Sequence, residues 1–371
     1  MWSHSRLLIF VIAIVHIAGP ISVFGSTADD SAKDLIRKAA KLTRRGAHPD
    51  AEAHLRRAMQ MEPNNSAAKV ELAFSLAKQR RLLEAYDLVF PVAEAEPGNA
   101  RAFAVLGTTL LFAGRFRDAR TIFYKALRID KREHLAWAGY GMVDFYENRL
   151  ADSLDKLGQA VFLKASEPDY LFANAQVSAR AERYRTAADN YAAFLRHSHI
   201  EDADRRARIK GLIAFLRVLG QVDGLHVSSG KQQTSVPFEL IGDRPVINVK
   251  INGSDEPLRF VLDTGSGISV LSEETAKRIG IKPVTRGGYA RGIGGDGKFE
   301  IVYSLLREIT IGDVTVKTVP VFLRKLHSES EHFDGYIGLS LISKFLTTID
   351  YGDSTFSLTK RDHGLLDPNE N

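Results

Sequence analysis

The sequence predicts a multidomain protein in which an all-α solenoid of helical pairs is followed by an all-β half-barrel. Two observations support this prediction. A 34-residue period of small and large apolar residues begins at Ala32, and beyond residue 235 the apolar residues alternate with the period of strands. The length of 371 residues also exceeds what one hydrophobic core usually organises, so two folded regions are expected.

The first 25 residues have the order of a secretory signal peptide. Arg6 precedes an apolar run at residues 7–18, and small residues lead up to Gly25. An uncleaved anchor is the alternative, but Gly19-Pro20 shortens the run below what a hydrocarbon core of roughly 30 Å requires. We therefore expect an exported chain, periplasmic or secreted, that leaves the membrane when residues 1–25 are removed and stays anchored when they are kept.

Composition excludes several classes of site. The sequence has no Cys, which excludes disulfides, Cys-bearing zinc sites and thiol nucleophiles. The formal charge is +5, and no dense basic tract is interleaved with aromatic residues, so we expect no nucleic-acid partner. We expect no cofactor either.

Each repeat unit is defined by three places that are small, large and apolar in turn. These residues are Ala51, Leu55, Ala58; Ala85, Val89, Val92; Ala119, Phe123, Ala126; Ser153, Leu157, Ala160; and Ala187, Tyr191, Phe194. The eighth place of every unit is small, as Ala39, Ala73, Gly107, Gly141 and Ala175. Small residues at fixed places let antiparallel helices approach closely, while the larger ones fill the groove between neighbouring pairs.

This pattern resembles the tetratricopeptide repeat (TPR), although the third unit has Lys131 where the family has proline. The resemblance implies a groove that holds a peptide or a protein partner. An irregular helical bundle is the alternative. An amphipathic segment at residues 202–219 predicts a capping helix, so the array spans residues 32–220. The following residues 221–235 are rich in Gly, Ser and Gln and predict a linker.

Beyond the linker, short strands and a hairpin turn at Asn252-Gly253 predict a barrel over residues 236–360, followed by a tail at 361–371. The expected strands are residues 245–251, 258–262, 300–305, 306–311, 314–323, 346–349 and 355–358. Two short helices are expected at residues 273–279 and 341–345.

Asp263 is the candidate catalytic carboxylate. It follows an apolar strand and precedes Thr264 and Gly265, and the glycine permits a tight turn. A carboxylate at the end of a buried strand faces a cleft while the sheet holds its backbone, which is the placement that acid–base chemistry requires. Asp-Thr-Gly alone is a common turn tripeptide, so the surrounding sequence must decide whether it is structural or catalytic.

Three motifs in one order resemble the retropepsin family of aspartic proteases. They are Leu262-Asp263-Thr264-Gly265-Ser266, then Gly292-Ile293-Gly294-Gly295, then Tyr336-Ile337-Gly338. The resemblance implies that Asp263 carries the chemistry, that the Thr264 hydroxyl braces two active-site loops, and that residues 292–295 form a flap over a polypeptide substrate. The chain departs from retroviral members at Leu339-Ser340, where they have Arg and then Asp or Asn, an internal polar brace.

One carboxylate cannot perform this reaction alone, because one Asp must accept a proton from water while another, protonated, polarises the amide carbonyl. No second Asp-Thr-Gly or Asp-Ser-Gly exists, and Asp334-Gly335 reads as a structural turn. We therefore expect an aspartic endopeptidase that dimerises through the protease domain, with one Asp263 from each chain at a two-fold axis. The alternative is a non-catalytic TPR scaffold that binds peptides and keeps an acid-protease fold.

Other motifs are given less weight. The run at residues 292–298 fits a phosphate-binding loop, but Phe299 replaces the Ser or Thr that holds magnesium and a strand follows instead of a helix. His197, His199 and the His- and Glu-containing run at 327–332 lack a third fixed ligand, so no metal site is expected. Ser266 and Ser269 have no His at the spacing of a nucleophile.

Overall fold

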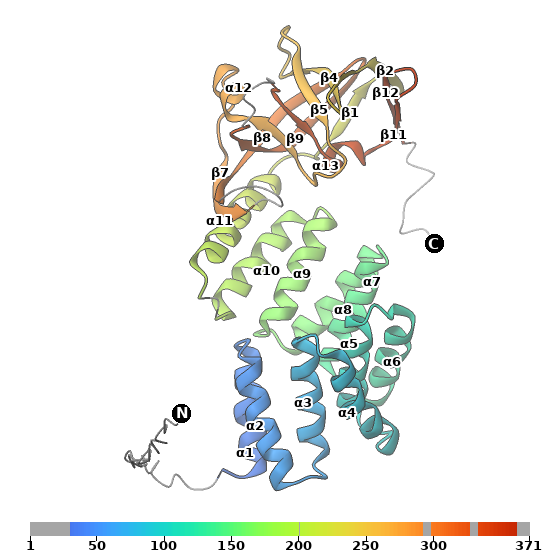
Figure 1. Cartoon of the computed structure of the whole chain (residues 1–371), viewed down its shortest axis with the longest axis vertical. Coiled ribbons are helices and arrows are strands. Elements are labelled where there is room, and N and C mark those ends of the chain that lie inside the picture. The colour runs from blue at the N-terminus through green and yellow to red at the C-terminus, as the bar shows by residue number, and fades with distance from the viewer. Residues whose placement is uncertain (1–29, 200, 292–297, 327–332, 362–371) are drawn as a thin grey trace, which may run out of the picture.

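The computed structural model describes residues 30–199, 201–291, 298–326 and 333–361. As predicted, an all-α repeat region precedes a β-rich domain, and the two follow one another along the long axis of the molecule (Figure 1). The helices of the first part are α1 (Ala32–Arg44), α2 (His48–Met61), α3 (Ser66–Lys78), α4 (Leu82–Ala95), α5 (Ala100–Phe112), α6 (Phe116–Ile129), α7 (His134–Tyr146), α8 (Leu150–Leu163), α9 (Pro168–Arg180), α10 (Tyr184–His197) and α11 (Ala203–Leu219). None of the described helices is long and apolar enough to cross a bilayer.

The places that define the repeat form the core of the helix pairs. Leu55 of α2 is fully buried between Ala51 and Ala58, and the corresponding residues of α4, α6, α8 and α10 are buried as well. Gly107 of α5 shows why the eighth place stays small, because a Cβ there would lie 2.7 Å from the Phe123 ring. The repeat phase therefore follows directly from side-chain size.

Two asparagines one period apart begin helices α3 and α5. The side-chain oxygen of Asn65 accepts a hydrogen bond of 2.9 Å from the backbone N–H of Ala68, and that of Asn99 accepts one of 3.0 Å from Ala102. An N-cap of this kind satisfies N–H groups that the first turn leaves free. These caps fix where the second and third repeats begin.

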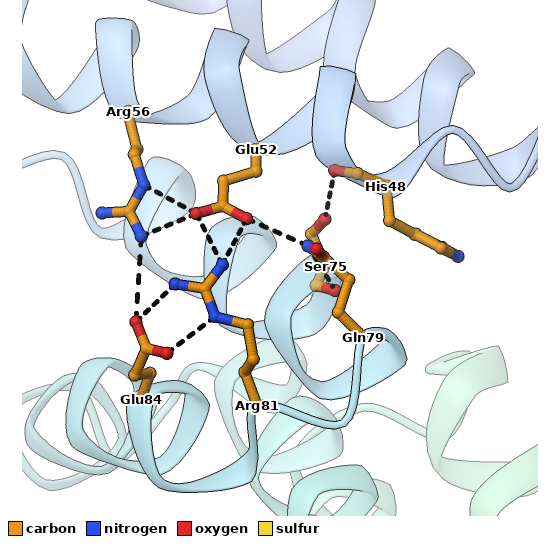
Figure 2. Close-up of polar contacts among 7 residues, drawn as sticks. All are labelled: His48, Glu52, Arg56, Ser75, Gln79, Arg81 and Glu84. Carbon is orange, nitrogen blue, oxygen red and sulfur yellow. Dashed lines mark hydrogen bonds and ion pairs between the residues drawn. The ribbon is translucent and has the colours of Figure 1, made fainter.

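A polar network joins the first two repeats. Glu52 of α2 accepts hydrogen bonds from Arg56, Gln79 and Arg81 (Figure 2). Arg81 also donates two hydrogen bonds, of 2.7 and 2.6 Å, to Glu84 of α4. Burial opposes ionisation of Glu52, but its three donors outweigh burial and lower its pKa. The ionised Glu52 thus ties α2 to the turn between α3 and α4.

The second part is built mainly of strands. They are β1 (Val227–Gly230), β2 (Gln233–Pro237), β3 (Glu239–Ile241), β4 (Arg244–Ile251), β5 (Leu258–Leu262), β6 (Ser269–Ser272), β7 (Thr285–Arg291), β8 (Lys298–Ile311), β9 (Val314–Arg324), β10 (Gly335–Ile337), β11 (Phe345–Asp350) and β12 (Thr355–Lys360). Two short helices, α12 (Glu273–Arg278) and α13 (Leu339–Ile342), interrupt them.

Six strands close into a barrel in the order β9, β6, β10, β5, β4 and β8, because β8 pairs with both β4 and β9. Strands β1, β3 and β7 add to β9, β4 and β8, and a separate sheet has the order β11, β12, β2. Phe260, Leu271, Ile337 and Phe356 are fully buried within the hydrophobic core of this domain. The strand β10 lies between β5 and β6, parallel to β5 and antiparallel to β6.

The border between the two parts differs from the expected linker at residues 221–235. Within this stretch β1 pairs with β9, and β2 starts at Gln233 and pairs with β12. All four residues of β1 are exposed, so backbone pairing holds the strand without an apolar face. Because β1 has no apolar face, its sequence resembles that of a linker, and a linker is what the composition of residues 221–235 predicts.

Other differences concern single elements. The runs at 300–305 and 306–311 form one strand, β8, and the second short helix starts at Leu339, two residues before the expected start, and ends before Phe345. The strands β3, β6 and β7 were not predicted. In β7, Gly287 and Gly288 break the apolar alternation that marks a strand.

His226 lies between α11 and β1, where the two parts meet. Its backbone N–H donates to the carbonyl oxygen of Thr318 at 3.2 Å, and its φ is 53°. Both ring nitrogens are buried without a hydrogen-bond partner in the described part of the chain. Burial lowers the pKa of His226 to about 4, an effect that Lys344 increases and Glu182 opposes.

We predict that acid weakens the fold through His226. The unfolded chain binds a proton there near pH 6.5 and the folded chain only near pH 4, so the stability due to neutral His226 is complete above pH 6.5 and is lost as the pH falls toward 4. Asparagine tolerates positive φ, so His226→Asn is a suitable variant. Between pH 7 and pH 4 its free energy of unfolding should fall by about 2 kcal/mol less than that of the parent. Urea unfolding at each pH measures this difference. The matched control is the exposed His197→Asn, and identical pH slopes for the parent and His226→Asn would contradict the prediction.

Candidate active site

Asp263 directly follows β5, and backbone contacts hold it. Its N–H donates to the carbonyl oxygen of Ile337 at 3.0 Å, which continues the parallel pairing of β5 with β10. One carboxylate oxygen, Oδ1, accepts a hydrogen bond of 3.0 Å from the Gly265 N–H. The side chain is half-buried, and the described residues give Oδ2 no hydrogen bond. The carboxylate is thus fixed by its backbone and still has one oxygen open for chemistry.

The Asp263 loop, residues 263–268, is joined to the turn at residues 338–340, which follows β10 and begins α13. Leu339 N–H donates to Ser266 O at 2.8 Å, and Ser340 N–H donates to Gly267 O at 3.0 Å. From the strand that follows the loop, the buried Ser269 hydroxyl accepts a hydrogen bond of 3.0 Å from the Gly338 N–H. These bonds make the loop and the turn one structural unit.

Gly338 is required by the close approach of these two segments. A Cβ at this position would lie 2.7 Å from the backbone carbon of Ile268 and 2.9 Å from the carbonyl oxygen of Ser266. Any side chain would therefore push the turn away from the Asp263 loop. This contact gives a physical reason for the glycine in the Tyr336-Ile337-Gly338 motif.

The structure brings Asp263, Thr264 and Gly265 together in one loop. The Thr264 side chain is exposed and makes no hydrogen bond to any described residue. The backbone N–H of Leu339 binds this loop, and 43% of this apolar residue is exposed. The expected flap residues Gly292, Ile293, Gly294 and Gly295 lie outside the described residues, although the strands β7 and β8 on either side of them are described.

Asp334 serves as a polar brace at the start of β10, level with Arg259 and at the other end of this strand from Asp263. Its carboxylate accepts hydrogen bonds from Arg259 N–H at 2.8 Å, Thr275 Oγ1 at 2.6 Å and Arg278 Nη2 at 2.8 Å. The pKa of Arg278 is raised, chiefly by its hydrogen bond to Glu256, with Asp334 adding to the effect. Asp334 therefore links β5, α12 and the start of β10, and it is occupied by these donors.

The bracing role of Asp334 was missed from the sequence, where this residue was expected only as part of a turn. An internal polar brace was also expected to be absent, because Leu339 stands where retroviral members have Arg. The ion pair of Asp334 with Arg278 provides a polar brace elsewhere in the domain, at the start of β10. The sequence feature that indicates this brace is an Asp directly before an apolar strand, together with an Arg at the end of a predicted helix.

The structure also places two motifs given less weight. Phe299 and Glu300 lie in the strand β8, and the Phe299 ring lies under the Arg324 guanidinium at 4.1 Å. A helix after the glycine-rich run, as a phosphate-binding loop requires, is therefore not formed by residues 298–311. Among the described residues, which include His197 and His199, no group of three His, Asp or Glu side chains could hold a metal ion.

Two family models match parts of the chain. Residues 247–341 match the aspartyl protease family, and residues 42–108 match the tetratricopeptide repeat family. A TPR region thus precedes an aspartyl protease domain. No curated protein matches the chain.

Solved structures resemble each part separately. The thermophilic TPR protein TTC0263 of Thermus thermophilus is 20% identical, covers 49% of this chain and 99% of its own, and gives a TM-score of 0.43. Pseudomonas aeruginosa pilF is 17% identical, with coverage of 52% and 88% and a TM-score of 0.38. A retropepsin-like aspartic protease from Rickettsia conorii is 19% identical, with coverage of 36% and 95% and a TM-score of 0.27.

We predict that Asp334→Asn destabilises the β-rich domain. The substitution keeps the side-chain volume but replaces one acceptor oxygen by an N–H₂ group that faces hydrogen-bond donors. The free energy of unfolding should therefore fall by about 2 kcal/mol. Urea unfolding measures the change. The matched control is Glu256→Gln, which removes the exposed partner of the same Arg278 and should cost at most about 0.5 kcal/mol. Equal losses in the two variants would show that Asp334 is no brace.

Proposed function

We propose that the protein is an aspartic endopeptidase that acts as a homodimer, with one Asp263 from each chain at the shared site. The observation that supports it best is the geometry of the Asp263 loop. Backbone hydrogen bonds fix the carboxylate at the end of a buried strand while one of its oxygens stays free. This is the arrangement that a group exchanging protons with substrate needs.

The chemistry requires a second carboxylate. One Asp, ionised, takes a proton from the attacking water, while the other, protonated, polarises the scissile carbonyl, and their mutual repulsion drives their pKa values apart. Asp334 is not available for this role because three donors already hold it. A second copy of Asp263 supplies the missing group.

Exposed side chains around the loop support pairing of two chains. Thr264 offers a free hydroxyl and Leu339 an exposed apolar side chain, both in segments that contact each other beside Asp263. Across a two-fold axis the same patch meets itself, so each Thr264 would bind the loop of the other chain. Burial of the two leucines would remove apolar surface from water.

The helical array is proposed to recruit the polypeptide substrate or a protein partner. A cavity of about 330 Å³ lies among α1, α3, α5, α7 and α9. Its wall combines apolar side chains, including Phe74, Phe112 and Phe172, with charged ones, and an ion pair of 2.5 Å joins Lys78 of α3 to Asp169 of α9 within this wall. A wall that carries both apolar and charged groups suits a peptide side chain next to a polar backbone.

Export is part of the proposal. Residues 1–25 have the composition of a signal peptide, which would place the protease in the periplasm or outside the cell, or on the membrane if the segment is retained.

Asp263→Asn is predicted to abolish cleavage. The amide can neither take the proton from water nor share one with its counterpart, so kcat/KM should fall by at least about a thousandfold. A peptide-library digest from acidic to neutral pH measures this, with the exposed Asp353→Asn as the matched control. Failure of the parent to cut any peptide at any pH would favour the rival function, a TPR scaffold that binds peptides without chemistry.

Mixing of chains tests the shared site. If each site needs two Asp263 carboxylates, a ninefold excess of the Asp263→Asn chain that exchanges freely should leave about one tenth of the parent's activity. The excess of Asp353→Asn chain serves as control and should add activity instead. Unchanged parent activity after exchange, or an active monomer in analytical ultracentrifugation, would contradict the dimer.

A further inference from the structure

The last helix of the array, α11, contacts β7 backbone to backbone (Figure 1). A Cβ at Gly211 would lie 2.3 Å from the Cα of Gly287 and 2.5 Å from the carbonyl oxygen of Arg286. On the next residue, a Cβ at Gly288 would lie 2.9 Å from the Ala207 side chain, and its φ of +69° favours glycine. Glycine on both sides lets the helix and the strand approach to this distance.

Polar contacts hold the helix to both strands of the β7–β8 pair. Arg208 of α11 donates to the carbonyl oxygen of Tyr289 in β7 at 2.7 Å. Lys298, the first residue of β8, forms an ion pair of 2.6 Å with Asp204. The first turns of α11 therefore contact both strands at the end where β7 finishes and β8 starts.

An aromatic column continues from α11 into the barrel. Phe215 stacks on Tyr303 of β8 with ring centroids 4.6 Å apart, and Tyr303 contacts Phe322 of β9 edge-on at 5.2 Å. Tyr303 belongs to the same buried cluster as the apolar residues of α9, α10 and α11. The array and the barrel thus share one core, which opposes the relative motion that two domains otherwise show.

The column ends next to the candidate active site. Phe322 of β9 is in register with Val270 of β6, one residue after Ser269. Ser269 accepts the hydrogen bond from Gly338 that ties β6 to the turn bound to the Asp263 loop. A continuous set of packed rings and hydrogen bonds, one of them to the Ser269 hydroxyl, therefore runs from α11 to the loop that carries Asp263.

We propose that α11 is a positioning element of the active site: Gly211 and Phe215 set the position of β7, β8 and β9, and through them the position of the Asp263 loop. The inference rests on the proposed endopeptidase function, because the loop is positioned for cleavage. In this arrangement the array is a structural part of the catalytic unit as well as a recruiting module. In this role Gly211, Phe215 and the Tyr303 ring on which Phe215 stacks do not touch the substrate.

The test is Gly211→Ala in the full chain. The added methyl cannot fit at 2.3 Å from the Cα of Gly287, so α11 must move away from β7. The matched control is Gly158→Ala, a helical glycine of α8 with nothing within 4 Å of the added Cβ. Both variants replace one glycine by alanine within a helix of the array, and only one of them presses on the barrel.

Two readouts decide the outcome. Hydrogen exchange should rise in β7, β8 and residues 263–271 of Gly211→Ala and stay at the parent level in Gly158→Ala. The pH profile of kcat/KM for a short peptide should become narrower in Gly211→Ala, because carboxylates that move apart repel less and their apparent pKa values converge. A mere loss of folded protein lowers the amplitude of the profile and leaves its width unchanged.

Exchange confined to β7 and β8, or a profile of parental width, would overturn the positioning role. If the parent cleaves no peptide, the proposed function fails, and hydrogen exchange at residues 263–271 still decides whether α11 positions the loop. Circular dichroism of both variants should match the parent, which keeps the comparison between folded proteins.

Discussion

The insertion of β10 between β5 and β6 is the constraint on which the site depends. Parallel pairing with β5 brings Ile337 to the backbone N–H of Asp263, and the turn after β10 then meets the Asp263 loop at Ser266 and Gly267. Each of these contacts uses main-chain groups, so it holds the loop without using the carboxylate. The side chain is left with one bound and one open oxygen. Rigid backbone and an available carboxylate oxygen are both needed for proton transfer at a defined point.

Much of this fold could be predicted because the patterns report side-chain size. The repeat phase follows from small residues such as Gly107, where the Phe123 ring leaves no room for anything larger. The strand β4 follows from the alternation of buried and exposed residues over 247–251, and β5 follows as the apolar strand that returns after the turn at Asn252-Gly253. Prediction fails where backbone pairing replaces side-chain burial. The exposed strand β1 and the glycine-containing β7 are held by hydrogen bonds to β9 and β8, which no local pattern reveals.

The candidate site shows the same division. The position of Asp263, Thr264 and Gly265 in a loop after β5 could be predicted because a turn tripeptide after a buried strand is a local feature, whereas their role in catalysis stays a prediction. The role of Asp334 depends on Arg259, Thr275 and Arg278, three residues distant in sequence that only the folded chain assembles. Similarly, the lack of side-chain space at Gly338 becomes visible only when Ile268 lies against it. Contacts between segments far apart in sequence therefore decide what sequence patterns leave open.

A chain without cysteine must hold its two parts together without disulfides, by packing and by polar contacts such as those of Arg208 and Asp204. Here the contact uses glycines on both sides, which brings the backbone of α11 against that of β7, and places Tyr303 in a core shared with the array. Such a contact tolerates little displacement, because packed interiors lose dispersion energy steeply as a gap opens. The proposed dimeric site requires two carboxylates at a fixed separation, and this rigidity would present Asp263 in one position on each chain. In that proposal the helical array, although built from separate repeats, contributes to the precision of a site on the β-rich domain.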